Sequence, residues 1–177
     1  RYLLSFNLFH NRLQKLITRT TWTAPDGGYR NFLGNSGRWT TTGLELGLQA
    51  QPTNSMQLEL SATYQDTTDP DHSDRDAEYS PAWLSQFKVS YQWTSKVTLG
   101  LTGYYVAPMK TQFDTALQNP DGSFGGRIGQ TSESYSVWNA NLRFGNWLTK
   151  GTFANLHLYN LLDQEIRYPT YSANRWA

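Results

Sequence analysis

The sequence predicts an all-β fold: an antiparallel up-and-down transmembrane β-barrel fragment of about seven consecutive strands. Two observations lead to this prediction. Apolar and polar residues alternate in seven runs, as they do in strands whose two faces meet different surroundings. The links between these runs are long and short in turn. In an up-and-down sheet this alternation places tight turns at one rim and long loops at the other, which is the layout of an outer-membrane barrel.

The strands follow from the alternation in chain order. They cover residues 2–17, 37–50, 56–66, 83–93, 97–106, 135–145 and 152–161. The first is the least regular, because Phe9 and Leu13 shift the phase set by Leu4, Phe6 and Leu8, which predicts a bulge or a strand that runs on beyond the membrane. We expect the short links at the periplasmic rim and the long ones outside the cell. The short links are 51–55, 94–96 and 146–151, and the long ones are 18–36, 67–82 and 107–134.

Each strand divides into an aliphatic phase and a polar phase, since successive side chains point to opposite faces. Ionisable residues in the middle of the last six strands all fall in the polar phase, which we predict to face the lumen: Glu45, Glu59, Lys88, Arg143 and His157. A cation facing lipid near the midplane costs about 2–4 kcal/mol, so none is expected there. The aliphatic phase is predicted to face lipid, and it includes Leu46, Leu58, Leu101, Leu142 and Leu156.

A soluble antiparallel sheet with one wet face would show the same alternation. Strand length and aromatic residues favour the membrane barrel. The strands reach about 10 residues, whereas soluble strands average about 5–6. Aromatic residues gather near both strand ends, as in the interface girdles of membrane barrels. Trp93, Trp147 and Phe153 lie by the short turns, and Tyr64, Trp83, Tyr105 and Tyr135 lie towards the long loops.

Composition narrows the function classes. The 177 residues carry a net charge of +1 and no cysteine, which gives no basic patch for nucleic acid, no disulfide framework and no thiolate metal site. No apolar run is long enough for a transmembrane helix. The chain opens in strand pattern at Arg1 without a secretory signal, so we expect residues 1–177 to be one part of the barrel domain of a longer protein.

No catalytic or cofactor motif emerges. Glu45 and Glu59 share a phase on hairpin-paired strands and could face each other diagonally as a glycosidase pair, but lumen carboxylates facing water are commoner. The acidic stretch 66–78 lacks the EF-hand pattern, which leaves a solvated loop or an irregular calcium site open. The histidines have no ligand spacing, and the glycines between 122 and 129 precede no helix. We therefore predict no enzyme activity, no cofactor and no transition-metal site.

Several segments in chain order resemble TonB-dependent outer-membrane receptors. Residues 31–50 are similar to the family's strand with spaced Asn and Gly followed by Gly-x-Glu. Tyr64-Gln65-Asp66, a polar loop and Tyr79-Ser80-Pro81-Ala82-Trp83 resemble the next strand, loop and strand. The segments 135–142 and Asn160-Leu161-Leu162-Asp163 resemble motifs near the carboxyl end. The resemblance covers essentially the whole chain, and the ordered set is more specific than any single motif.

The resemblance implies a barrel of about 22 strands around an N-terminal plug, in the bacterial outer membrane. Such receptors import ferric siderophores, haem, cobalamin or glycans with energy relayed by TonB. The expected partners are therefore outer-membrane lipid, the TonB complex (through N-terminal parts that these residues do not include) and a small-molecule or chelate ligand. We expect neither the plug nor the family's last strand within residues 1–177.

Ligand recognition is expected in the outer loops and upper lumen, where aromatic rings stack on ligands and cations pair with anionic chelates. The candidate residues are Tyr79, Trp83, Phe113, Phe124, Arg127, Tyr135, Tyr171 and Trp176. Girdle or loop packing is the alternative role for most of them. Two alternatives for the whole protein stay open: a passive porin-like or adhesive outer-membrane barrel, and a soluble carbohydrate-binding β-sheet protein.

Overall fold

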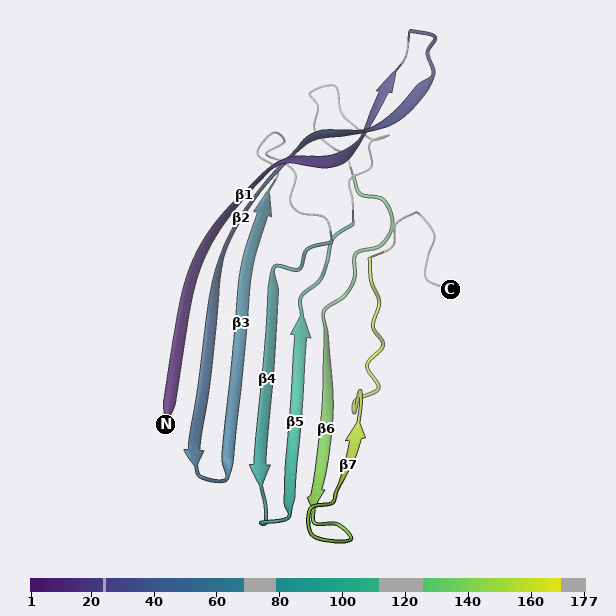
Figure 1. Cartoon of the computed structure of the whole chain (residues 1–177). Coiled ribbons are helices and arrows are strands. Elements are labelled where there is room, and N and C mark those ends of the chain that lie inside the picture. Colours follow the sequence, from purple (N-terminus) through teal and green to yellow (C-terminus); the bar gives the residue numbers. More distant parts are fainter. Residues whose placement is uncertain (24, 69–78, 112–125, 170–177) are drawn as a thin grey trace.

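A computed structural model describes residues 1–23, 25–68, 79–111 and 126–169. These residues form one antiparallel sheet in which each strand pairs with its neighbours in the chain, in the order β1 to β7 (Figure 1). The strands are β1 (Tyr2–Thr23), β2 (Tyr29–Thr53), β3 (Met56–Thr68), β4 (Trp83–Gln92), β5 (Val97–Val106), β6 (Tyr135–Gly145) and β7 (Phe153–Leu158). The predicted all-β, up-and-down architecture with seven consecutive strands is confirmed.

The tight turns lie at one rim of the sheet and the longer connections at the other (Figure 1). Asn54 and Ser55 alone link β2 to β3. In the next tight turn the Thr94 hydroxyl accepts hydrogen bonds from the backbone N–H of Lys96 and Val97, at 3.2 and 3.0 Å. Asn146 adopts a φ of 51° and its side chain accepts a bond from the Gly151 N–H at 2.9 Å. Local side-chain bonds of this kind fix the register of each hairpin.

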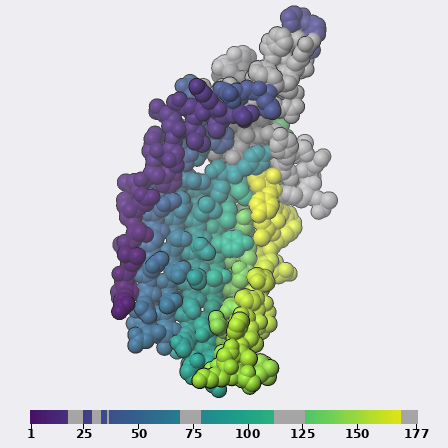
Figure 2. All heavy atoms as spheres, viewed as in Figure 1, coloured from purple at the N-terminus to yellow at the C-terminus, as the bar shows by residue number. Residues whose placement is uncertain are grey.

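The prediction of a long loop over residues 18–36 is wrong. β1 continues to Thr23 and β2 starts at Tyr29, so the two strands form a ribbon whose tip includes residues 25–28. The tip stands well away from the rest of the sheet (Figures 1 and 2). The stretch 18–23 lacks apolar alternation but is rich in threonine, which favours extended backbone. Outside a membrane a paired ribbon needs no apolar face. The alternation of apolar and polar residues therefore ends before the strand does.

The irregularity predicted in the first strand lies at Lys15. The β1–β2 register is unbroken from Tyr2 to Leu13 and shifts on both sides of Leu16, and Lys15 has a φ of 57°. These features define a β-bulge, which bends a strand and increases its twist. The sequence placed the phase shift at Phe9, but this is wrong, since Phe9 pairs in register with Gly43. The strand also runs on beyond the bulge to Thr23.

Registers across the sheet place the predicted aliphatic phases of the strands on one face. One row runs from Leu4 through Leu48, Leu60 and Phe87 to Gly103 and Trp138. Many of these side chains are exposed, for example Leu46 at 40% and Leu156 at 51%. An apolar surface of this breadth is far larger than soluble monomers leave open to water. Among the described residues, no helix has the length and apolar character needed to cross a membrane.

We predict that the tight turns are periplasmic and that the β1–β2 tip is outside the cell. In the complete protein, Asp26→Cys should react in intact cells with a thiol reagent that cannot cross the outer membrane, because residues 25–28 are exposed at the tip. Ser95→Cys, in the β4–β5 turn, should react only after the cells are opened. The reverse labelling pattern would contradict this orientation.

Candidate ligand-binding site

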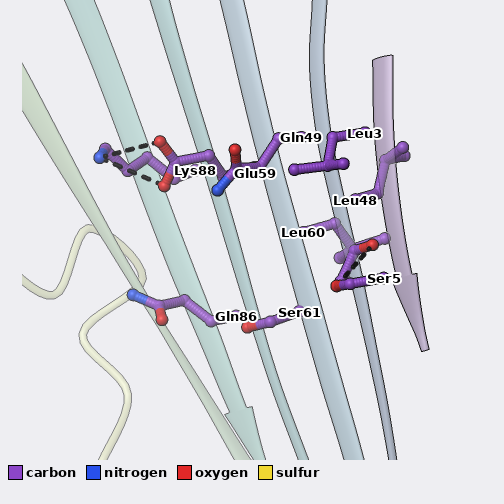
Figure 3. Close-up of a pocket in the computed structure, with 10 residues that line it drawn as sticks. Leu3, Ser5, Leu48, Gln49, Glu59, Leu60, Ser61, Gln86 and Lys88 are labelled. Atoms are coloured by element: carbon purple, nitrogen blue, oxygen red, sulfur yellow. Dashed lines mark hydrogen bonds and ion pairs between the residues drawn. The ribbon is translucent and has the colours of Figure 1, made fainter. Parts of the chain in front are cut away.

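Polar side chains on the face opposite the leucines contact one another across the strands. The Asn7 amide donates to the Glu45 carboxylate at 3.1 Å, and the Lys88 ammonium lies 3.4 Å from the Glu59 carboxylate (Figure 3). The side chains of Asn141 and His157 lie 3.1 Å apart. Both members of the Lys88–Glu59 pair are 49% exposed, so the pair contributes little to stability. All five residues predicted to face the lumen share this face by register.

The registers exclude the carboxylate pair considered from the sequence. Glu45 lies opposite Thr63, whereas Glu59 lies opposite Gln49, four positions further along β2. Diagonal neighbours in a sheet are two positions apart, so the prediction that Glu45 and Glu59 face each other is wrong. Each carboxylate instead has its own polar partner, Asn7 or Lys88.

A small recess lies on this polar face between β1 and β4. Its volume is about 170 Å³, and its lining includes Gly47, where the Ser5 hydroxyl occupies the space that a side chain would need. Figure 3 shows the side chains of Gln49, Glu59, Ser61, Gln86 and Lys88 around it. Pockets for drug-sized ligands measure about 300–1,000 Å³, so this recess suits water or a small ion and not a chelate.

A cluster of buried apolar residues lies at the outer end of the polar face. Val106, Met109, Tyr135 and Val137 form one buried cluster. The Tyr135 ring stands edge-on to Tyr104, with centroids 6.4 Å apart. Tyr135 pairs with Val106 in the polar phase, so its predicted place in the lipid-facing girdle is wrong. Phe153 shares that phase opposite Gly145, beneath the Arg143 guanidinium at 4.8 Å, and is likewise no girdle residue.

Hydrogen bonds join the two legs of the β5–β6 connection near its base. Met109 N–H donates to the Ser132 hydroxyl at 2.9 Å, and Ser132 N–H donates to the Met109 carbonyl at 3.0 Å. Tyr79 N–H donates to the Lys110 carbonyl at 2.8 Å, which ties in the β3–β4 connection. Arg127 donates to the Thr111 carbonyl, and the buried Thr111 hydroxyl has no hydrogen-bond partner among the described residues. The outer end therefore has an ordered platform from which the longer segments emerge.

The candidate ligand-binding residues divide into three groups. Tyr79, Arg127 and Tyr135 belong to the outer platform, where Tyr79 is 36% exposed with a φ of 55°. Trp83 lies on the apolar face opposite Tyr64, with ring centroids 6.2 Å apart, which favours a girdle role. Phe113, Phe124, Tyr171 and Trp176 lie outside the described residues.

Tyr104 and Thr111 were not among the candidate ligand-binding residues predicted from the sequence. Tyr104 is 38% exposed and stands in the polar phase of β5, a signal that alternation alone could have given. Of the acidic residues in the stretch 66–78, the structure describes only Asp66. Within the described parts of the chain, no three His, Cys, Asp or Glu residues are grouped closely enough to hold a metal ion.

The segment after β7 is fixed by Asn160. Its side chain donates to the Gln164 carbonyl at 3.0 Å and accepts from the Gln164 N–H at 2.9 Å, with φ at 50°. Leu161 N–H then donates a hydrogen bond to the Trp138 carbonyl. This bond is shifted by one residue from the register of the Ala140–Leu158 pair. Beyond it, a hydrogen bond from Arg167 lowers the pKa of the exposed Glu165 carboxyl. Asn160 thus explains why the strand predicted to reach 161 ends at Leu158.

The described strands resemble parts of solved outer-membrane receptors. The ferric-catecholate import receptor Fiu from E. coli K12 is 22% identical, with a TM-score of 0.62 over 93% of this chain and 21% of its own. The copper transporter OprC is 18% identical, with a TM-score of 0.67 over 94% of this chain and 24% of its own. The ferripyoverdine receptor of Pseudomonas aeruginosa is 15% identical, with a TM-score of 0.66 over 93% of this chain and 21% of its own. The chain thus spans about a quarter or less of each of these proteins, and at these identities the likeness concerns the fold.

Sequence comparison identifies the family. No curated protein matches the chain. The family model described as TonB dependent receptor-like, beta-barrel, matches residues 1–161, which is most of the chain. This match agrees with the seven-stranded meander, its one apolar face and its long connections at one rim. The chain therefore belongs to the β-barrel domain of the TonB-dependent receptors, proteins of the outer membrane of Gram-negative bacteria.

Proposed function

We propose that the complete protein is a ligand-gated importer that takes up a small metal chelate across the outer membrane with energy relayed by TonB. The family match over residues 1–161 is the observation that supports this proposal most strongly. The receptor family is one of transport proteins, so the proposal includes no enzymatic step. The long connections at one rim provide a capture surface, and the polar face provides a wall for a hydrated path.

The outer platform carries aromatic rings and cations, which suit a chelate of the siderophore type. Tyr104 offers a partly exposed ring, and the buried Tyr135 holds it in an edge-on arrangement. Tyr79 adds a second ring, and its N–H bonds to the carbonyl of Lys110, while Arg127 donates to the Thr111 carbonyl of the same platform. Aromatic faces stack on catecholates and cations pair with anionic chelates. The similar structures named above include receptors for a ferric catecholate and for ferripyoverdine.

Dependence on TonB separates this proposal from the passive barrel. Cells that express the complete protein should accumulate a radioactive ferric catecholate, and removal of TonB should abolish the accumulation while surface binding persists. Uptake that continues without TonB and follows the external concentration would favour the porin-like alternative. Binding without uptake in either strain would favour the adhesive one.

We predict that the β5–β6 connection contributes to ligand capture. Deleting residues 113–125 from the complete protein should leave the barrel assembled, because the Met109–Ser132 bonds below the deletion keep the flanking strands in register. Binding of the ferric catecholate should weaken at least tenfold, or about 1.4 kcal/mol, because long connections between strands are commonly functional. Equilibrium binding to purified protein measures the change. An assembled deletion variant that binds as tightly as the parent would exclude this connection from the site.

A further inference from the structure

The ribbon formed by β1 and β2 has an open edge along β2. β2 begins at Tyr29, but its pairing with β3 starts only at Thr40, which lies opposite Thr68, the last residue of β3. Within the described parts of the chain, Leu33–Asn35 pairs with β1 alone. The backbone groups of a strand point alternately to its two sides, so this stretch presents N–H and C=O groups on the side away from β1. The edge can therefore accept a further strand.

The side chains beside this edge suit the approach of another backbone. Gly34 and Gly37 carry none, and glycine inside a strand often marks a place where a second backbone comes close. Leu33 and Ile17 are each 73% exposed. They are diagonal neighbours on one face, because Ile17 pairs with Asn35. The edge thus has an open apolar pair next to it, on a ribbon that stands away from the rest of the sheet (Figure 2).

The ribbon is strongly cationic. Residues 12–38 include five Arg or Lys residues and one acidic residue, Asp26, for a net charge of +4, whereas the whole chain carries +1. Arg19 lies opposite Leu33, and Arg30 precedes Leu33 by three residues. Like charges on paired strands repel, so this charge disfavours pairing with the ribbon of a second copy. An acidic strand is the complementary partner.

The ribbon also holds its shape before any partner arrives. At its tip the Asp26 carboxylate accepts a hydrogen bond from the Gly28 N–H at 3.0 Å, and Gly27 adopts a φ of 78°. From Ile17 to Thr23 every residue of β1 has a partner in β2. An edge that is ordered in advance loses little conformational entropy when a strand adds to it.

We propose that the β2 edge at Leu33–Asn35 binds an extended acidic segment of another protein, outside the cell, by strand addition. Backbone hydrogen bonds to the edge supply affinity. An apolar side chain beside Leu33 and carboxylates near Arg19 and Arg30 supply selectivity. The interaction needs neither a chelate nor TonB, so its failure and the failure of the proposed import are separate results.

The test uses the complete receptor in a neutral detergent and two fluorescent peptides of about ten residues. In the first peptide valine and glutamate alternate. The second has the same sequence with every backbone nitrogen methylated, which removes the donors for strand pairing and keeps the charge. Fluorescence anisotropy should show that the receptor binds the first peptide at least about tenfold more tightly than the second.

Receptor variants test the contacts beside the edge. Arg19→Gln/Arg30→Gln should bind the first peptide about tenfold more weakly than the parent, because two nearby cations are lost. Leu33→Thr keeps a residue that favours strands but removes the apolar contact, and it should weaken binding about fivefold. The control Lys96→Gln/Lys150→Gln removes cations from the turns at the opposite rim and should bind like the parent. A heat-modifiability gel confirms that each variant is assembled.

Hydrogen exchange locates the bound peptide. With the first peptide present, exchange of the backbone N–H groups of residues 33–37 should slow at least about tenfold, while exchange at residues 25–28 should not change. The proposal is overturned if the parent does not bind the first peptide, if the methylated peptide binds equally well, or if exchange at 33–37 is unaffected. Displacement of the peptide by dextran sulfate at the same charge concentration would also overturn it, since the ribbon would then be a general anion site.

Discussion

Replacing Leu101 by Arg in the complete protein should cost about 2–4 kcal/mol or block assembly, because it would expose a cation to lipid near the middle of the membrane. Leu101 lies in the middle of β5 on the apolar face, between Val89 of β4 and Ala140 of β6. Neither neighbour can pair with the charge. Equilibrium unfolding by urea in lipid vesicles measures the loss, and a heat-modifiability gel shows whether the barrel forms.

The matched change on the polar face is Ser90→Arg. Ser90 lies opposite Gly100, which leaves room for a longer side chain in water. This variant should lose less than about 1 kcal/mol, as expected for an exposed substitution. Leu58→Arg should fall between the two, because Leu58 lies close to the β2–β3 turn and a charge near the interface costs less. Equal damage from Leu101→Arg and Ser90→Arg would contradict the assignment of the two faces.

Replacing Gly43 by Ala should destabilise the barrel by about 1–3 kcal/mol, the usual cost of overpacking. A Cβ at this position would lie 2.2 Å from the Phe9 ring and 2.6 Å from the Tyr64 carbonyl oxygen. The ring can rotate away, but the carbonyl belongs to the backbone of β3 and can move only with its strand. Urea unfolding of the assembled receptor again provides the measurement.

Gly100→Ala is the control, since it adds the same methyl group on the same face. There the nearest atom would be the Asn141 Cβ at 3.5 Å, an ordinary contact. A change of less than about 1 kcal/mol is expected, with stabilisation possible because alanine restricts the unfolded chain. The double variant Phe9→Ala/Gly43→Ala should recover only part of the loss. Full recovery would show that the Phe9 ring, and not the Tyr64 carbonyl, forbids a side chain at position 43.

The parts of the fold that the membrane imposes were predictable from the sequence. Lipid requires an apolar side chain at every second position, so strands such as 97–106 and 135–145 were predicted with the bounds that the structure shows. Where the chain leaves the membrane this requirement ends. Residues 18–23 and 29–36 therefore looked like a loop although they form a paired ribbon.

The outer platform was less predictable because its contacts join segments far apart in the chain. Tyr135 was assigned to the lipid interface from its position near a strand end, yet the register places it on the other face beside Met109. The phase of Tyr135 relative to Trp138 was available in the sequence and would have corrected this. The hydrogen bonds between Met109 and Ser132 depend on backbone geometry, for which the residue types give no signal.

The strictly sequential pairing of the strands has a consequence for the order in which the chain assembles. Each strand finds its partner next to it in the chain, so hairpins can form and add one after another without crossing the chain over itself. Closing the long segment between β5 and β6 costs more chain entropy than closing the tight β4–β5 turn, by about 2 kcal/mol from loop length alone. We therefore infer that β1–β5 and β6–β7 form as two units and that their junction is the last pairing in this part of the barrel.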